Sequence, residues 1–273
     1  MINEIVAVIV LYKTKLEDSI TFKSLINLKR NDDQLLNLFV YNNSPEFEQA
    51  PIMQLAGVAI RYEKDFHNSG LSLAYNKAAE YADSIKKSWL LLLDQDSELP
   101  EDFFYQINKS VAEFSDQSFF APVLKHEDTI LSPCSFKNMK GSALKSIDLG
   151  INSLKDKSIF NSGILVKLSF FNAIGGYNEN ISLDFSDHAF VHRVKKNTND
   201  FVVMPIFINH EFSTFSNDQN VIYRRFQQYV KGIKAYYKYE EKSLYLILWT
   251  FLRAVKLTLK YKSFKFIIAL AKK

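Results

Sequence analysis

The stretch WLLLLDQDS at residues 89–97 joins an apolar β-strand to two carboxylates. Its continuous apolar run is typical of a strand covered on both faces, as in a parallel sheet. Asp94 and Asp96 follow directly, where the chain leaves the strand. Two carboxylates this close repel each other unless a proton or a cation compensates them, and hard cations such as Mg²⁺ or Mn²⁺ prefer carboxylate and phosphate oxygens. The stretch therefore indicates a strand end that could hold a divalent cation against a diphosphate. The alternative is that Asp94 and Asp96 are ordinary loop or cap aspartates, because a bare Asp-x-Asp is common.

Strands and helices alternate from the start of the chain up to this stretch. Short apolar or β-branched runs occupy residues 5–11, 36–41 and 58–62, and apolar residues recur at helical spacing over 16–28 and 70–87. This alternation predicts an α/β fold, a Rossmann-like and mainly parallel sheet flanked by helices. In such folds the ligand site lies at the carboxyl ends of the strands.

The later pattern is less regular. Residues 119–156 mix short apolar pieces with Lys, Ser and Asn, and no element can be assigned there. Asn161-Ser162-Gly163 predicts a turn into a strand over 164–166. A turn at 175–178 precedes an acidic segment, and residues 187–196 are expected to form a helix.

The length of 273 residues suits one large α/β domain with a small helical extension. The lone Cys134 excludes an intramolecular disulfide and a cysteine-based zinc cluster, which fits a reducing compartment such as the cytosol. Residues 5–10 are too short for a membrane span, and Glu4 stands where a targeting signal carries basic residues. We expect a cytoplasmic protein.

Charge is sorted along the chain. Residues 1–223 hold 21 basic and 28 acidic groups, net −7, whereas residues 224–273 hold 13 and 2, net +11. Charged residues interrupt the apolar runs at 244–249 and 264–270 before about 20 uncharged residues accumulate, so a spanning helix is not expected. We expect a catalytic domain over 1–220 and a basic amphipathic helical tail over 221–273.

This tail allows three interpretations. Helices of this kind can lie in a membrane interface, with Lys and Arg near anionic lipid. They can instead merely cover the domain, with their lysines in water. Binding to nucleic acid is the third and weakest interpretation, and nucleic acid is not an expected partner, because no recognisable nucleic-acid-binding motif accompanies the charge.

Residues 93–97 (LDQDS), 10–13 (VLYK) and 40–44 (VYNNS) together resemble glycosyltransferase family 2, most closely its bacterial rhamnosyltransferase-like branch. The resemblance covers about the first 215 residues. It implies the GT-A fold and an inverting, metal-dependent transfer of a sugar from a nucleotide diphosphate donor to an acceptor hydroxyl. By this resemblance Asp94 and Asp96 bind the metal and the diphosphate, with Asp96 the more direct ligand.

The resemblance also implies a nucleotide site at the ends of the first two strands. The turn at Tyr12 and the loop that begins with Asn42 and Asn43 would border the nucleotide. The family usually has an aspartate where this chain has Asn42. The family's contact to the nucleobase, uracil or thymine, is therefore not assigned to Asn42.

Residues 68–78 resemble the family's Asn-x-Gly-x-x-x-Ala-x-Asn segment, which places Asn68, Gly70 and Asn76 near the donor. Gly70 would permit close backbone approach at the start of a helix, whose amino-terminal amides favour an anion. The alternative is an ordinary loop that enters a helix, with Asn68 or Ser69 as its cap.

Residues 175–188 resemble the family's Gly-Gly-Phe-Asp-Glu stretch, which leads to the catalytic base. The matching position is Asp187, and Asp184 is the substitute. Asp187 can instead be a helix amino-terminal acid stabilised by the dipole. The acid often found two residues after the base is Ala189 here, and Arg193 falls where the family carries an Arg.

His210 follows an apolar, strand-like run. A lone histidine is more often structural than a metal ligand, but some family members complete the metal site with a histidine at about this place. The other histidines show no spacing typical of zinc ligands.

The donor sugar is not encoded in a recognisable motif. Rhamnose on a thymidine diphosphate follows only from the closest resemblance. The expected acceptor is a lipid-linked or cell-surface polysaccharide, met at the inner face of the plasma membrane.

Two other classes remain open. In a phosphatase of the haloacid dehalogenase type, Asp94 would be the nucleophile and Asp96 the acid. That class has its aspartates after the first strand, with Thr or Val where this chain has Glu98. A non-catalytic, membrane-associated protein that binds sugar nucleotides is the other class.

Overall fold

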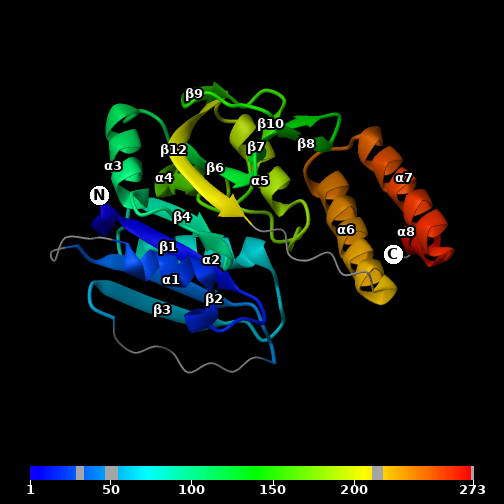
Figure 1. Cartoon of the computed structure of the whole chain (residues 1–273), viewed down its shortest axis with the longest axis horizontal. Helices are drawn as coiled ribbons and strands as arrows, with labels where there is room; N and C mark the ends of the chain where they lie inside the picture. The colour runs from blue at the N-terminus through cyan, green and yellow to red at the C-terminus, as the bar shows by residue number, and fades with distance from the viewer. Residues whose placement is uncertain (29–33, 47–54, 211–217, 272–273) are drawn as a thin grey trace.

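The computed structural model describes residues 1–28, 34–46, 55–210 and 218–271, and a curled sheet of twelve strands forms its centre (Figure 1). The path through the sheet runs β10-β7-β6-β11-β4-β1-β2-β3, with β12 beside β6. The strands are β1 Ile5–Leu11, β2 Leu36–Asn42, β3 Val58–Lys64, β4 Trp89–Leu93, β5 Ser97–Glu98, β6 Phe119–His126, β7 Thr129–Lys137, β8 Lys140–Leu144, β9 Gly150–Ser153, β10 Lys157–Ser158, β11 Leu165–Lys167 and β12 Asp200–His210.

The first four strands form a parallel unit. β1 lies between β2 and β4, and β2 lies beside β3, all in parallel. These strands confirm the elements expected over residues 5–11, 36–41, 58–62 and 89–93. Because they run in one direction, their carboxyl ends meet at one edge of the sheet, where the polar segments after β1, β2 and β4 gather.

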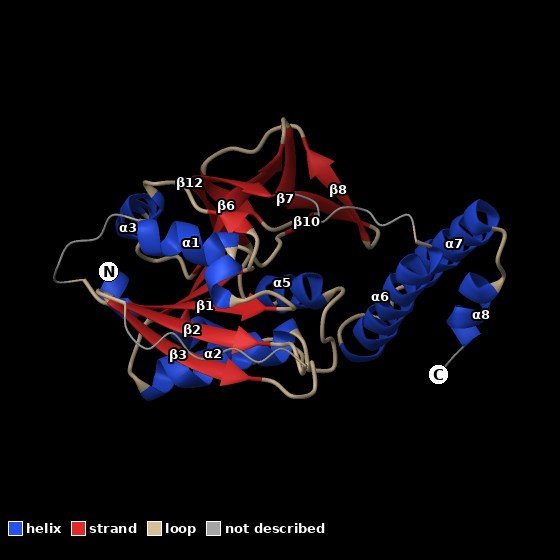
Figure 2. Ribbon diagram, turned by 60° about the horizontal axis from the view of Figure 1, so that its bottom comes forward, coloured by secondary structure: helices blue, strands red, loops and turns tan. Residues whose placement is uncertain are grey.

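Helices cover both faces of the sheet (Figure 2). Alternate residues of β1 enter two separate cores: Val6 and Val8 pack with α2 and α5, whereas Ile5 and Ala7 pack with α1 and α3. This layering confirms the predicted α/β fold. The helices are α1 Ile20–Asn27, α2 Leu71–Ser84, α3 Phe103–Glu113, α4 Leu168–Ala173, α5 Ser186–Lys195, α6 Gln219–Tyr239, α7 Leu244–Tyr261 and α8 Lys265–Ala271.

The helix expected over residues 16–28 is interrupted. A 3₁₀ turn occupies Leu16–Asp18, and α1 starts only at Ile20. Ser19 causes the break, because it has extended backbone geometry and its Oγ caps α1 by accepting the Phe22 amide at 3.2 Å.

The second half of the sheet is mixed. β11 runs antiparallel between β4 and β6, and β12 runs parallel to β6. Four strands, β6 to β9, lie in the segment 119–156, where the sequence pattern assigned no element, and β10 follows directly after it. β8 and β9 have mostly exposed side chains, so they carry no apolar signal.

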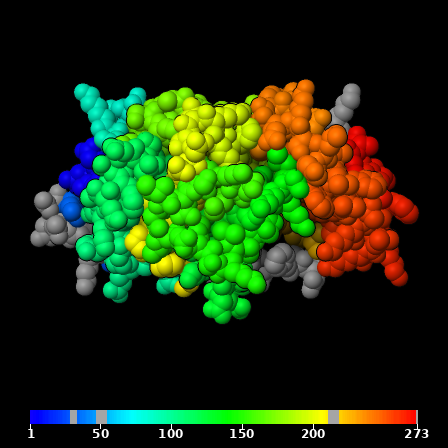
Figure 3. Space-filling model, turned by 90° about the horizontal axis from the view of Figure 1, so that it is seen from above, coloured from blue at the N-terminus to red at the C-terminus, as the bar shows by residue number. Residues whose placement is uncertain are grey.

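The basic tail forms α6, α7 and α8 at one end of the molecule (orange to red in Figure 3). Ile233 and Tyr236 of α6 and Leu246 of α7 pack with Ile181 and Ala189 near the start of α5. Trp249 of α7 donates its indole N–H to the Asn138 carbonyl in the β7–β8 turn, at 2.8 Å. The tail is therefore attached to the sheet domain through α6 and the near end of α7.

Candidate active site

A cavity of about 360 Å³ opens beside the carboxyl end of β4. Its walls come from the end of β4, the first residue of α2, the end of β6, the loop after β10, the segment that leads into α5 with the first turn of that helix, and the middle of α6. Acidic residues on this wall are Asp94, Asp184 and Asp187. Aromatic residues are Phe160, Phe185 and Tyr229. The cavity thus combines three carboxylates with aromatic surface.

Asp94 is the first residue after β4. Its Oδ1 accepts a hydrogen bond from the buried Tyr75 hydroxyl at 3.3 Å. Burial raises the pKa of Asp94 to about 7, the nearby Asp96 and Asp187 add to this rise, and the bond from Tyr75 opposes it. A carboxyl in this position needs a proton or a cation near neutral pH, so the oxygen ligands present fit a hard divalent cation.

Asp96 lies in a turn that is tied down on both sides. The Gln95 side chain accepts the Tyr12 amide at 2.7 Å and donates to the Tyr12 carbonyl at 3.4 Å. Ser97 donates its amide to Thr21 Oγ1 at 2.8 Å, and its hydroxyl bonds to Ser162 at 2.7 Å. These bonds hold the turn against the strand ends, so Asp96 is presented by a braced segment.

Asp187 lies in the first turn of α5 and lines the same cavity as Asp94. Its Oδ1 accepts the His188 amide at 2.7 Å. The His188 ring stacks on Phe136 and bonds to the Ser158 hydroxyl at 2.6 Å, which anchors this turn of α5 to β7 and β10.

Asp184 lies before the start of α5 and lines the same cavity. Burial raises its pKa, against the lowering influence of Arg225 and Arg253 in the tail. The structure therefore brings both base candidates to one wall.

Asn42 and Asn43 bond within the protein. Asn42 is buried, donates to the Tyr62 hydroxyl at 2.8 Å and accepts the Ser44 amide at 3.1 Å. Asn43 accepts the Gly70 amide at 3.1 Å. The two residues shape the ends of β2 and β3, and neither lines the cavity.

Gly70 permits a close contact between two loops. Its φ is +102°, and a side chain there would collide with the backbone of Ser182. The Leu71 amide, the first of α2, donates to the Ser182 carbonyl at 2.7 Å. This amide is therefore occupied by protein. Asn68 is exposed in the loop before α2, and its φ is +51°.

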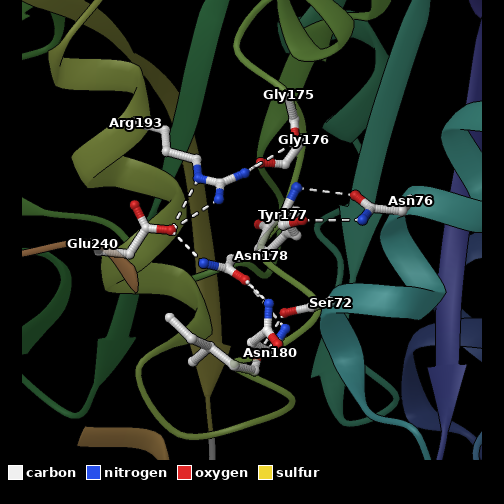
Figure 4. A network of polar contacts seen from close by, with 10 residues as sticks. Ser72, Asn76, Gly175, Gly176, Tyr177, Asn178, Asn180, Arg193 and Glu240 are labelled. Carbon is white, nitrogen blue, oxygen red and sulfur yellow. Dashed lines mark hydrogen bonds and ion pairs between the residues drawn. The ribbon is translucent and has the colours of Figure 1, made fainter. Parts of the chain in front are cut away.

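Asn76 and Arg193 both fasten the turn at residues 175–178 (Figure 4). Asn76 accepts the Tyr177 amide at 2.9 Å and donates to the Tyr177 carbonyl at 3.0 Å. Arg193 donates to the Gly175 and Gly176 carbonyls at 3.0 and 3.1 Å and pairs with Glu240 at 2.9 Å. Both residues brace the segment that leads to Asp187.

His210 ends β12, where its backbone pairs with Ser97, next to Asp96. Its side chain lies outside the described part of the chain. Among the residues that the structure describes, no group of three or more His, Cys, Asp or Glu side chains could hold a metal ion. Asp94 and Asp96 would thus need further ligands, such as diphosphate oxygens.

Two residues near the site were not identified from the sequence. Asp65 follows β3 and is buried, and its carboxylate accepts the amides of His67 and Ser69. Its position after a predicted strand was a usable signal. Tyr229 lines the cavity from α6, and no local pattern marks it because the contact exists only after the tail folds back.

Comparisons with solved structures reveal the same fold in several sugar-transferring enzymes. GalNAc-T7 with UDP, GalNAc and Mn²⁺ aligns with a TM-score of 0.59 and 12% identity, over 84% of this chain and 47% of that one. S. aureus TarS 1–349 with UDP-GlcNAc gives 0.57 and 12%, over 98% and 79%. The mannosyltransferase PcManGT from Pyrobaculum calidifontis with GDP-Man and Mn²⁺ gives 0.54 and 12%, over 98% and 74%.

No family model and no curated protein sequence matches the chain. The chain spans about half the length of the GalNAc-T7 chain. At this level of identity the likeness establishes the fold alone. The sheet order, the parallel half that ends in Asp94 and Asp96, and these structural neighbours together assign the chain the GT-A fold of glycosyltransferases.

Proposed function

We propose that the protein is an inverting, metal-dependent glycosyltransferase that uses a nucleotide diphosphate sugar. The observation that carries this proposal is one cavity lined by Asp94 from the end of β4 and Asp187 from the start of α5. The GT-A fold supports the assignment to glycosyltransferases, and two structural neighbours were crystallised with the nucleotide sugars UDP-GlcNAc and GDP-Man.

In this proposal Asp187 is the catalytic base. The acceptor oxygen bonds to the anomeric carbon on the face opposite the diphosphate, the bond from that carbon to the diphosphate oxygen breaks, and Asp187 takes the hydroxyl proton. Its bond to the His188 amide orients the carboxylate for this role.

Asp94 and Asp96 would hold Mg²⁺ or Mn²⁺ together with donor oxygens. A bound divalent cation neutralises charge on the leaving diphosphate. Tyr75 orients Asp94, and the bonds from Gln95 and Ser97 keep Asp96 at the strand end. GalNAc-T7 and PcManGT were each crystallised with Mn²⁺, which supports this part of the proposal.

The donor nucleotide is assigned to the carboxyl ends of β1, β2 and β3. Tyr12 and Asn68 would contact it, while Asn42, Asn43 and Gly70 shape the loops and Asn76 braces the turn behind them. The exposed Tyr12 ring and the exposed Asn68 side chain are available for such contacts.

The finer assignment is a donor with rhamnose on thymidine diphosphate and an acceptor in cell-surface polysaccharide synthesis. It rests on the sequence resemblance to the rhamnosyltransferase-like branch. We assign catalysis to residues 1–220 and place the protein in the cytoplasm, at the inner face of the plasma membrane.

A panel of nucleotide sugars, incubated with and without Mg²⁺ or Mn²⁺, tests the proposal. We expect thermal stabilisation by one donor with metal, and release of its nucleoside diphosphate. Asp96→Ala should abolish metal-dependent turnover. Asp187→Asn should lower transfer by about 10²–10⁴-fold while donor binding persists, because general-base catalysis contributes on that order.

Asp184→Asn and the exposed Asp128→Asn are the controls. Loss of transfer in Asp184→Asn with a wild-type rate in Asp187→Asn would move the base to Asp184. If no donor stabilises the protein or is turned over with either metal, the proposed function is wrong.

A further inference from the structure

Helix α7 exposes its large apolar side chains. They recur every three or four residues, which places them on one side of the helix. Leu244 and Leu259, near the two ends of the helix, keep 79% and 73% of their surface exposed. The outer face of α7–α8 is defined here as Leu244, Ile247, Leu248, Phe251, Leu252, Leu259, Phe264 and Ile268, all exposed.

The inward side of α7 shows the opposite composition. Its buried residues are Leu246, Thr250, Ala254 and Thr258, spaced four apart. Two of these four carry hydroxyl groups, and Thr250 donates its hydroxyl back to the Leu246 carbonyl at 2.6 Å. A helix on a water-facing surface normally buries its large apolar residues and exposes polar ones. The outer face therefore suits an apolar environment.

The charge around this face has one sign. Residues 242–273 contain eight basic residues and no acidic residue. Lys256, Lys260 and Lys262 are exposed on α7 or directly after it. A partner that covers the outer face would therefore need to be apolar inside and negatively charged at its rim.

The dimensions of the helices limit the geometry of such a contact. No helix in the described residues is long and apolar enough to cross a membrane. Basic flanks beside an apolar stripe are typical of helices that lie in the plane of a bilayer, with lysines at the headgroups.

We propose that the outer face of α7–α8 docks onto the surface of an anionic lipid bilayer. The apolar side chains enter the boundary between headgroups and acyl chains, and the lysines contact lipid phosphates. This binding does not require the proposed reaction.

The docked helix lies next to the cavity. The Arg253 guanidinium of α7 stacks 4.0 Å above the ring of Tyr229, which lines the cavity from α6. If the proposed function holds, only the Tyr229 side chain of α6 separates the cavity from Arg253 of the docked helix, and this closeness to the lipid surface suits a lipid-linked acceptor.

Sedimentation with lipid vesicles, without donor or acceptor, tests the docking. Full-length protein should bind vesicles of phosphatidylglycerol and phosphatidylcholine, and should bind pure phosphatidylcholine at least tenfold more weakly. Leu248→Ser/Phe251→Ser should reduce binding to the mixed vesicles at least tenfold. Lys256→Gln/Lys260→Gln should reduce it roughly fivefold per charge, because each basic group near the surface contributes about 1 kcal/mol.

Matched controls come from the far end of the molecule, where α3 lies opposite α7 (Figure 1). Tyr105 of α3 is also exposed, at 66%, so Tyr105→Ser removes a similar apolar group. Lys23→Gln/Lys109→Gln removes two exposed charges from α1 and α3. Both controls should bind vesicles as the wild type does.

Three outcomes overturn the docking. They are no binding of wild-type protein to anionic vesicles, wild-type binding by Leu248→Ser/Phe251→Ser, and equal losses in the control variants. Light scattering, which measures the molar mass in solution, adds a fourth outcome. If the wild type were a dimer and Leu248→Ser/Phe251→Ser were a monomer, the outer face would be assigned to a second copy of the chain. Sugar transfer that persists in a variant unable to bind vesicles leaves the proposed function intact.

Discussion

Asp65 organises the loop between β3 and α2 at the residue scale. It is buried, and it accepts the amides of His67 and Ser69 and the Ser69 hydroxyl. Burial acts to raise its pKa, but the bonds from Ser69, His67 and Tyr41 outweigh burial and lower it. The carboxylate therefore stabilises the folded state in its charged form.

This shift predicts a pH-dependent stability. Because the folded pKa lies below the unfolded value of 3.8, the stabilisation is present above that value and is lost as the pH falls through the folded pKa. We expect Asp65→Asn to lower the free energy of unfolding by about 2 kcal/mol at pH 7. Urea unfolding from pH 7 to pH 3 measures whether the deficit shrinks below pH 4.

The exposed Asp128 provides the control for this measurement, since Asp128→Asn should leave stability unchanged within about 0.5 kcal/mol. A deficit in Asp65→Asn that stays constant over the whole pH range would contradict the assigned role of the charged form.

At the scale of elements, an ion pair connects α5 to the end of α6 (Figure 4). Arg193 bonds to Glu240 at 2.9 and 3.1 Å, and Asn178 donates to the same carboxylate oxygen at 2.6 Å. The Glu240 side chain is only 2% exposed, whereas Arg193 is 23% exposed. The helix that carries Asp187 is thereby joined to the tail by a buried charge.

Breaking this pair on one side should be costly. Arg193→Met leaves the Glu240 carboxylate buried without its partner, and we expect about 3 kcal/mol of destabilisation. Arg193→Met/Glu240→Leu should recover part of that loss, because it removes both charges. Denaturant unfolding of the full double-mutant cycle gives the coupling energy.

The exposed pair Lys77 and Glu80 on α2 serves as the comparison. Exposed pairs couple weakly, so the same cycle there should give no more than about 1 kcal/mol. Equal coupling energies at the two pairs would mean that burial of Glu240 does not matter.

At the scale of the whole molecule, stability is divided between the sheet domain and the outer helices. The two large cores lie on the two faces of the sheet, and α6 to α8 contribute none of their residues. Helices α6, α7 and α8 pack instead in two small hydrophobic clusters. We therefore expect regions with different local stability.

Native-state hydrogen exchange in lipid-free solution measures this difference. Amides in the middle of α7 and in α8 should exchange at least about tenfold faster than those of β1, β2 and β4, because one side of α7 lacks partners. Exchange of α7 only at the rate of global unfolding would show that the tail and the sheet form one cooperative unit.

The sequence predicted the parallel half of the fold in detail. Residues 5–11, 36–41 and 89–93 are buried on both faces, so their runs are largely apolar and their strand character is local. Residues 58–62 form the edge strand, where only Val58 is buried. The same runs located Asp94, because a residue after a buried strand lies at the sheet edge. The mixed half was not predictable in this way, since β8 and β9 expose most of their side chains and depend on pairing with distant strands.

The sequence by itself determined the strand ends, the carboxylates on them and the basic, apolar tail, because each depends on neighbours along the chain. Only the tertiary structure decided which groups share a cavity. Asp94, Asp187 and Tyr229 come from positions more than 40 residues apart in sequence and meet because β4, α5 and α6 pack around one opening. It also decided which side of α7 faces outward, since a helical stripe of apolar residues does not specify what covers it.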